Sequence, residues 1–82
     1  MAAIVYILKG SKGRHYIGAT SNLQQRLDRH NSGMVHSTKR LGLPLVIVSS
    51  KEFSNMDEAL RIERMLKKWK NPSKSIDYLN QG

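Results

Sequence analysis

The fold is decided by residues 3–19, which read AIVYILKGSKGRHYIGA. Residues 3–8 are apolar, short and rich in β-branched and aromatic side chains, a composition typical of a strand. A glycine-containing turn at residues 10–13 ends this run, and a second strand-like run follows at residues 15–19. This arrangement predicts a β-hairpin. Because residues 3–8 show no polar alternation, we expect both faces of the first strand to be covered.

A helix is expected directly after the hairpin. Thr20, Ser21 or Asn22 can cap it, because a side-chain oxygen at that position accepts an unpaired backbone N–H. The helix then extends to about Asn31, with Gly33 as its C-terminal stop. A loop containing two glycines and a proline continues to residue 44.

The rest of the chain predicts a strand and two helices. Residues 45–48 read LVIV and indicate a third strand. Asn55 and Glu58 have capping-box spacing and begin a helix that continues to about Lys70. The pair at residues 71–72, Asn-Pro, starts a short last helix. The sequence therefore predicts an α+β fold, a three-stranded antiparallel sheet flanked by helices in a single domain spanning residues 1–82.

The amino-acid composition limits the classes of partner that this chain is expected to bind. The chain has 82 residues, no cysteine, and 14 Lys plus Arg against 6 Asp plus Glu, for a net charge of +8. That charge favours a polyanion, nucleic acid or an anionic membrane surface. No apolar run approaches the ~20 residues of a membrane span, and no basic region precedes the first apolar run as in a signal peptide. We therefore expect a soluble cytoplasmic protein.

Two polar residues border the apolar face of the first helix. Arg26 and His30, spaced i and i+4, share an arc with Leu23 and Leu27, which must face the sheet. One interpretation is structural: the Arg stem lies along apolar surface and His30 makes one local hydrogen bond. The other is functional, and the spacing alone favours neither.

Glu63 lies near the middle of the apolar face of the second helix. A carboxylate on such a face is paired or bound to a cation. The structural alternative is a pair with Arg26 or with a Lys from another element. The functional alternative is a ligand for a hard cation such as Mg²⁺, which we favour because Arg, His and Glu would then face the same sheet. The apolar face comprises Met56, Ala59, Leu60, Ile62, Leu66 and Trp69.

Other candidate residues carry less information. Tyr6 and Tyr16 lie on the two hairpin strands, and whether they share a face depends on a register that the sequence does not give. A zinc site from His30 and His36 lacks a third ligand. Trp69 is interpreted as a core residue rather than a base-stacking platform. The basic residues of the second helix, which we expect to contact phosphates, are Arg61, Arg64, Lys67, Lys68 and Lys70.

Taken together, these residues resemble the GIY-YIG nuclease superfamily, and among its members the small stand-alone bacterial proteins related to the N-terminal nuclease domain of the bacterial excinuclease. The resemblance covers residues 5 to about 74. Its motifs here are residues 4–6 (Ile-Val-Tyr), residues 16–18 (Tyr-Ile-Gly), Arg26, His30 and Glu63.

Two positions differ from the family pattern. Ile4 stands where the family has Gly, and the stand-alone members also lack that Gly. Asn71 is a candidate for the family's late supporting Asn, although helix capping explains it equally well.

The resemblance implies a metal-dependent DNA endonuclease that hydrolyses phosphodiester bonds, directed to DNA structure or damage rather than to sequence. Glu63 would hold one Mg²⁺ or Mn²⁺. Tyr6, assisted by His30, would deprotonate the attacking water, with its pKa lowered by nearby cations such as Arg26. Tyr16 would orient that water, and Arg26 would clamp the scissile phosphate.

The resemblance also implies a DNA interface and partners. Gly18 would allow a close approach of backbone or phosphate. DNA is the expected partner, other repair proteins are further candidates, no membrane is expected, and no oligomeric state is indicated. The residues expected to contact DNA are Ser37, Thr38, Lys39, Arg40, Lys67, Lys68 and Lys70.

Two other hypotheses stay open. The chain could be a non-catalytic nucleic-acid-binding module that retains the nuclease fold, or an RNA- or ribosome-associated basic protein. The charge suits both, but neither explains a carboxylate on the apolar face of a helix.

Overall fold

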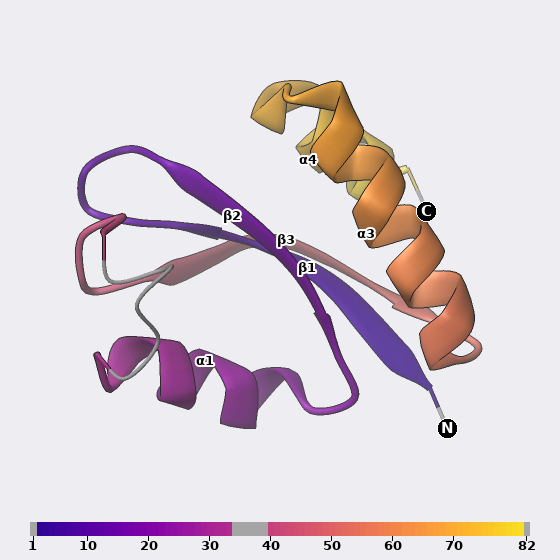
Figure 1. The fold of residues 1–82 in the computed structure, drawn as a ribbon, viewed down its shortest axis with the longest axis horizontal. Coiled ribbons are helices and arrows are strands. Elements are labelled where there is room, and N and C mark those ends of the chain that lie inside the picture. Colours follow the sequence, from indigo (N-terminus) through magenta and orange to yellow (C-terminus); the bar gives the residue numbers. More distant parts are fainter. Residues whose placement is uncertain (1, 34–39, 82) are drawn as a thin grey trace.

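A computed structural model of the protein describes residues 2–33 and 40–81. It contains a three-stranded antiparallel sheet with strand order β2-β1-β3 and helices on both faces (Figure 1). This confirms the predicted α+β fold. The elements are β1 (Ala3–Lys9), β2 (His15–Thr20), α1 (Leu23–Asn31), β3 (Val46–Phe53), α3 (Met56–Trp69) and α4 (Pro72–Asn80).

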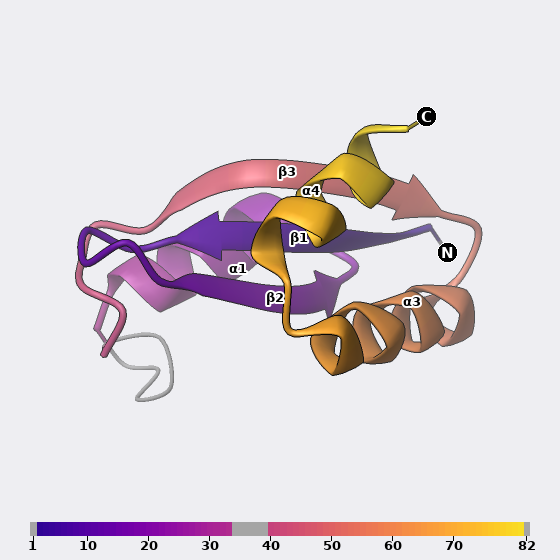
Figure 2. The same ribbon diagram turned by 90° about the horizontal axis from the view of Figure 1, so that it is seen from above.

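The central strand β1 separates two cores. Helix α1 covers one face of the sheet, and α3 and α4 cover the other (Figures 1 and 2). Val5 and Ile7 belong to the core beneath α3 and α4, whereas Tyr6 and Leu8 belong to the core beneath α1. All four are essentially inaccessible to solvent. The expectation that both faces of the first strand are covered is thus confirmed.

Asparagine caps begin each of these helices. The side-chain oxygen of the cap accepts the backbone N–H three residues further on, which satisfies one of the unpaired donors of the first turn. The caps are Asn22, Asn55 and Asn71. The predicted boundaries of the helices are therefore confirmed to within a residue or two.

The third strand is longer than predicted. The sequence indicated residues 45–48, but β3 extends to Phe53 through the polar residues 49–52. These residues pair with β1 along its first half, so the backbone ladder continues regardless of side-chain polarity.

The placement of Leu60 on the buried apolar face of α3 was also wrong, because Leu60 is 39% exposed.

The C-terminal end of α1 is tied to the start of the third strand. The Asn31 side chain accepts a hydrogen bond from Leu45 N at 2.7 Å and donates one to Leu45 O at 3.2 Å. These two hydrogen bonds fix the helix turn that carries His30.

Across residues 2–33 and 40–81, no helix has the length and apolarity needed to cross a membrane.

Candidate active site

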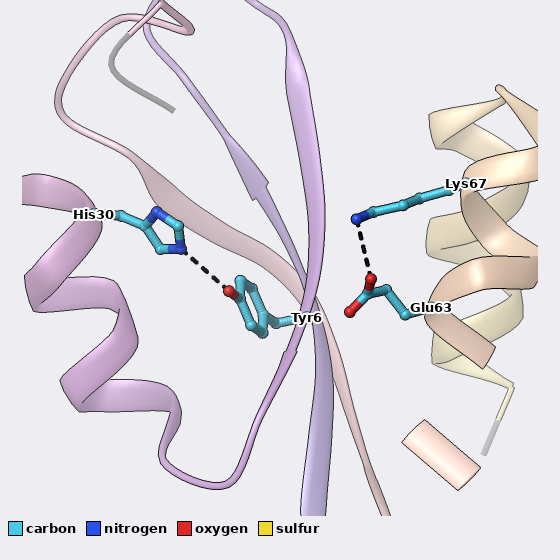
Figure 3. Close-up of polar contacts among 4 residues, drawn as sticks. All are labelled: Tyr6, His30, Glu63 and Lys67. Atoms are coloured by element: carbon cyan, nitrogen blue, oxygen red, sulfur yellow. Dashed lines mark hydrogen bonds and ion pairs between the residues drawn. The ribbon is translucent and has the colours of Figure 1, made fainter. Parts of the chain in front are cut away.

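Tyr6 and His30 form a buried hydrogen-bonded pair. Tyr6, in the middle of β1, points its hydroxyl towards α1, where it lies 3.1 Å from His30 Nε2 (Figure 3). Each residue is only 1% exposed. A histidine at the edge of the helix was expected, and the structure places it against the central strand.

Tyr16 joins this pair from the edge strand β2. Its ring centroid lies 6.4 Å from that of Tyr6 and 5.2 Å from that of His30. The strand register places Gly18 opposite Tyr6 and Tyr16 opposite Leu8. Both tyrosines therefore lie on the α1 face, which settles the register that the sequence left open.

Gly18 makes room for the Tyr6 side chain. A Cβ atom at this position would overlap the Tyr6 hydroxyl and lie 2.6 Å from Tyr6 Cζ, and it would also crowd the ring of Tyr16. The close approach expected at this glycine is therefore made by a tyrosine of the neighbouring strand.

We expect Gly18→Ala to destabilise the protein by about 1–3 kcal/mol, because an added methyl in a well-packed core forces its neighbours to shift. For a domain of this size, each kcal/mol lowers the melting temperature by about 4–8 °C. Thermal unfolding followed by circular dichroism measures the effect. An unchanged melting temperature would mean that the β1–β2 contact relaxes freely.

The pair is held in its neutral form. Burial raises the pKa of the Tyr6 phenol above its usual value; the charges of Tyr16 and Glu63 also raise it, and the Arg26 charge lowers it. Burial lowers the pKa of His30, and Arg26 and Arg29 lower it further. Arg26 lowers the Tyr6 pKa as expected, but burial outweighs this effect, so the net shift in the protein alone is upwards and not downwards.

His30 makes folding stability depend on pH. Its pKa in the folded protein lies below the unfolded value of 6.5, so the unfolded chain binds the proton more readily. The contribution of neutral His30 to folding stability is present in full above about pH 6.5. It is lost as the pH falls from there to the pKa of His30 in the folded protein. An NMR titration of the His30 ring protons, folded and in denaturant, checks this. A folded midpoint at or above the unfolded one would contradict it.

Glu63 approaches the site from the other side of β2. Its Oε1 atom lies 3.0 Å from Lys67 Nζ, and the Glu63 side chain is 18% exposed. Figure 3 shows both side chains extending from α3 towards the sheet. The carboxylate acts electrostatically on Tyr6. Its partner is a lysine of its own helix rather than Arg26 or a lysine of another element.

Arg26 lies on the opposite flank of the cluster. It is half-buried and acts electrostatically on both Tyr6 and His30. It also lines a polar cavity of about 540 Å³ together with Thr20 and Arg29. Arg26 is thus close to the neutral pair and accessible from a cavity, which suits a residue that binds an anion.

A second cavity, of about 300 Å³, lies between β2 and the junction of α3 and α4. Tyr16, Lys67, Lys70 and Asn71 are among its lining residues. Asn71 caps α4 through a hydrogen bond from Lys74 N at 3.1 Å, as the capping interpretation predicted. Its position on this cavity leaves a supporting role as a prediction.

The remaining predicted contacts are peripheral. Arg40 and Lys68 are exposed, whereas Ser37, Thr38 and Lys39 fall outside the described residues. His36 also falls outside them. Among the described residues, no group of three or more His, Cys, Asp and Glu side chains could hold a metal ion. A zinc site is not supported there.

Lys67 is the site residue whose contact the sequence reasoning missed. It was placed on the DNA-contacting face, but its ion pair with Glu63 was not foreseen. The signal was available, because Glu followed four residues later by Lys is the favourable order for a helix pair.

Comparisons with known proteins identify the family of the chain. A family model described as the GIY-YIG catalytic domain matches residues 2–77. A UPF0213 protein of Streptococcus pneumoniae is 36% identical over 80 residues, covering 98% of this chain and 80% of the relative. A UPF0213 protein of Bacillus pumilus is 34% identical over 71 residues, covering 87% of this chain and 72% of that relative. The solution NMR structure of a UPF0213 protein from Bacillus halodurans is 32% identical, with a TM-score of 0.52, covering 83% of this chain and 72% of that one.

Proposed function

Because the chain belongs to the GIY-YIG family of nucleases, we propose that it is a metal-dependent endonuclease that hydrolyses phosphodiester bonds in DNA. The family implies a nuclease and a DNA substrate. The observation that carries the proposal for this chain is the buried hydrogen bond between Tyr6 and His30 at 3.1 Å, together with the partly buried carboxylate of Glu63 on α3.

The donor set suits a hard divalent cation. Family members generally use such an ion, and a magnesium site needs only one or two carboxylates, with water and phosphate oxygens as the other ligands. Glu63 supplies one carboxylate and would hold the ion. When bound, Mg²⁺ or Mn²⁺ supplies positive charge that stabilises the developing charge on the phosphate oxygens.

The Tyr6–His30 pair can accept the proton of the attacking water. In the tautomer with the ring proton on Nδ1, the Tyr6 O–H donates to His30 Nε2. The Tyr6 oxygen can take a proton from water as its own proton passes to the neutral imidazole, so a phenolate need not form. Tyr16, whose ring centroid lies 6.4 Å from that of Tyr6, would orient this water.

Arg26 would bind the scissile phosphate. Its guanidinium presents paired N–H donors that match two phosphate oxygens, and it stays charged at every physiological pH. Burial lowers the His30 pKa and the charge of Arg26 lowers it further, which favours the neutral imidazole that can accept a proton. Arg26 would therefore position the substrate and help to keep the base neutral.

Nicking of a supercoiled plasmid tests the proposal. We expect nicked circles with Mg²⁺ or Mn²⁺ and none with EDTA. Arg26→Ala should remove nicking, and Arg14→Ala, which deletes the same charge from the exposed turn between β1 and β2, should retain it. Metal-dependent DNA binding without any cleavage would instead support the binding-module hypothesis.

We also propose that the substrate is chosen by structure rather than by sequence. With a net charge of +8, binding should be mainly electrostatic, and each neutralised phosphate should add about −0.9 to the log–log salt slope on duplex DNA. Cleavage of flapped, gapped and intact duplexes of equal sequence tests the choice. Equal rates on all three would contradict it. Repair proteins as partners and a cytoplasmic location stay predictions.

A further inference from the structure

Lys67 lies between the carboxylate and the aromatic part of the site. Its Nζ atom is 3.0 Å from Glu63 Oε1 and 5.7 Å from the ring centroid of Tyr16. Figure 3 shows its ammonium group beside the carboxylate, on the side of α3 that faces the sheet. The ammonium group of Lys67 therefore lies next to the carboxylate that would hold the metal ion.

This ammonium group and a divalent ion compete for the same carboxylate. Like charges a few ångströms apart repel each other, and the repulsion is stronger in a partly desolvated site than in water. Lys67 is 49% exposed, whereas Glu63 is only 18% exposed. The flexible lysine stem can therefore turn away while the carboxylate stays in place.

A destination for the displaced lysine is present. Lys67 lines the cavity of about 300 Å³ along β2, which Lys70 and Tyr16 also line. Two lysines on one open cavity at the edge of the site are suited to the phosphate backbone of a DNA strand. While it is paired with Glu63, Lys67 is only partly available to a phosphate.

We propose that Lys67 acts as a placeholder for the metal. It neutralises Glu63 in the metal-free protein, and once a divalent cation binds, it turns to a phosphate of the DNA strand in the neighbouring cavity. This inference rests on the proposed function, since it assumes that Glu63 is the metal ligand. Metal binding and DNA binding are then positively coupled, because each favours the state in which Lys67 has left Glu63.

Metal binding to the DNA-free protein is the first test. Titration with Mn²⁺, followed by loss of the free-ion electron paramagnetic resonance signal, should show tighter binding for Lys67→Met than for wild type by about 2- to 5-fold, the range expected for an exposed ion pair. Lys70→Met is the matched control, since it removes a charge from the same cavity without touching Glu63. Lys70→Met should change the Mn²⁺ affinity clearly less than Lys67→Met does.

DNA binding is the second test. The affinity for a fluorescein-labelled duplex is measured in Ca²⁺ and in EDTA. Lys67→Met should weaken binding more in Ca²⁺ than in EDTA, because only the metal-bound protein frees Lys67 for a phosphate. Lys70→Met should weaken it by the same factor in both. Equal penalties for Lys67→Met in the two buffers would overturn the placeholder role.

The two tests separate this inference from the proposed function. If Glu63→Gln abolishes Mn²⁺ binding but Lys67→Met leaves it unchanged, the placeholder role is wrong and the metal site stands. If Glu63→Gln binds Mn²⁺ as well as wild type does, the metal site itself is wrong and the inference fails with it.

Discussion

Glu63→Gln should abolish metal-dependent nicking and leave the fold intact. The amide keeps the shape of the side chain but loses the charge that a hard cation prefers. The carboxylate is paired with Lys67, which is 49% exposed, so loss of the pair should cost no more than about 1 kcal/mol. A buried pair would cost about 3–5 kcal/mol.

Melting in EDTA and nicking in Mn²⁺ measure the two effects of Glu63→Gln separately. Glu58→Gln is the matched control, because it changes the same charge in the first turn of α3, and it should nick as wild type does. A collapsed melting temperature would make Glu63 a structural residue. Retained nicking would remove it from the metal site.

Tyr6→Phe should reduce the rate of cleavage by about 100- to 10,000-fold, the usual contribution of a positioned proton-transfer group. The variant loses the buried hydroxyl that bonds His30, at a stability cost of about 1–3 kcal/mol. DNA affinity should stay unchanged, because Tyr6 is only 1% exposed. Single-turnover cleavage, with binding measured in Ca²⁺, separates rate from affinity.

Tyr78→Phe is the control for this variant. Tyr78 packs edge-on against Trp69 at a centroid distance of 5.6 Å, in the core beneath α3 and α4. The Tyr78→Phe variant should cleave at the wild-type rate. If Tyr6→Phe also cleaves at the wild-type rate, the Tyr6–His30 hydrogen bond is a packing feature and the proton must go elsewhere.

Local signals explain what the sequence predicted well. The hairpin and the three asparagine caps each depend on residues a few positions apart, and the cap hydrogen bonds form within one turn. The third strand was predicted too short because its second half is polar. Its pairing is set by β1, which lies over 40 residues earlier in the chain.

The chemical environment of the candidate site was hard to predict from the sequence. The family motifs named Tyr6, His30 and Glu63 as candidates, but not the surroundings of each side chain. The pKa of Tyr6 follows from burial beneath α1, a tertiary property, and burial reversed the expected direction. The Glu63–Lys67 pair, by contrast, follows from helix spacing alone and could have been predicted from the sequence.

The division of the site between the two faces of the sheet has a consequence for the protein during its own synthesis. The tyrosines and the histidine lie within the first 30 residues, whereas the carboxylate enters with α3 at position 63. A nascent chain therefore emerges with the residues of the proton-accepting pair before the group that would hold the cation. Under the proposed function, a product that ends before α3 would lack the metal-holding carboxylate, so hydrolytic competence would arise only when the last third of the polypeptide has docked.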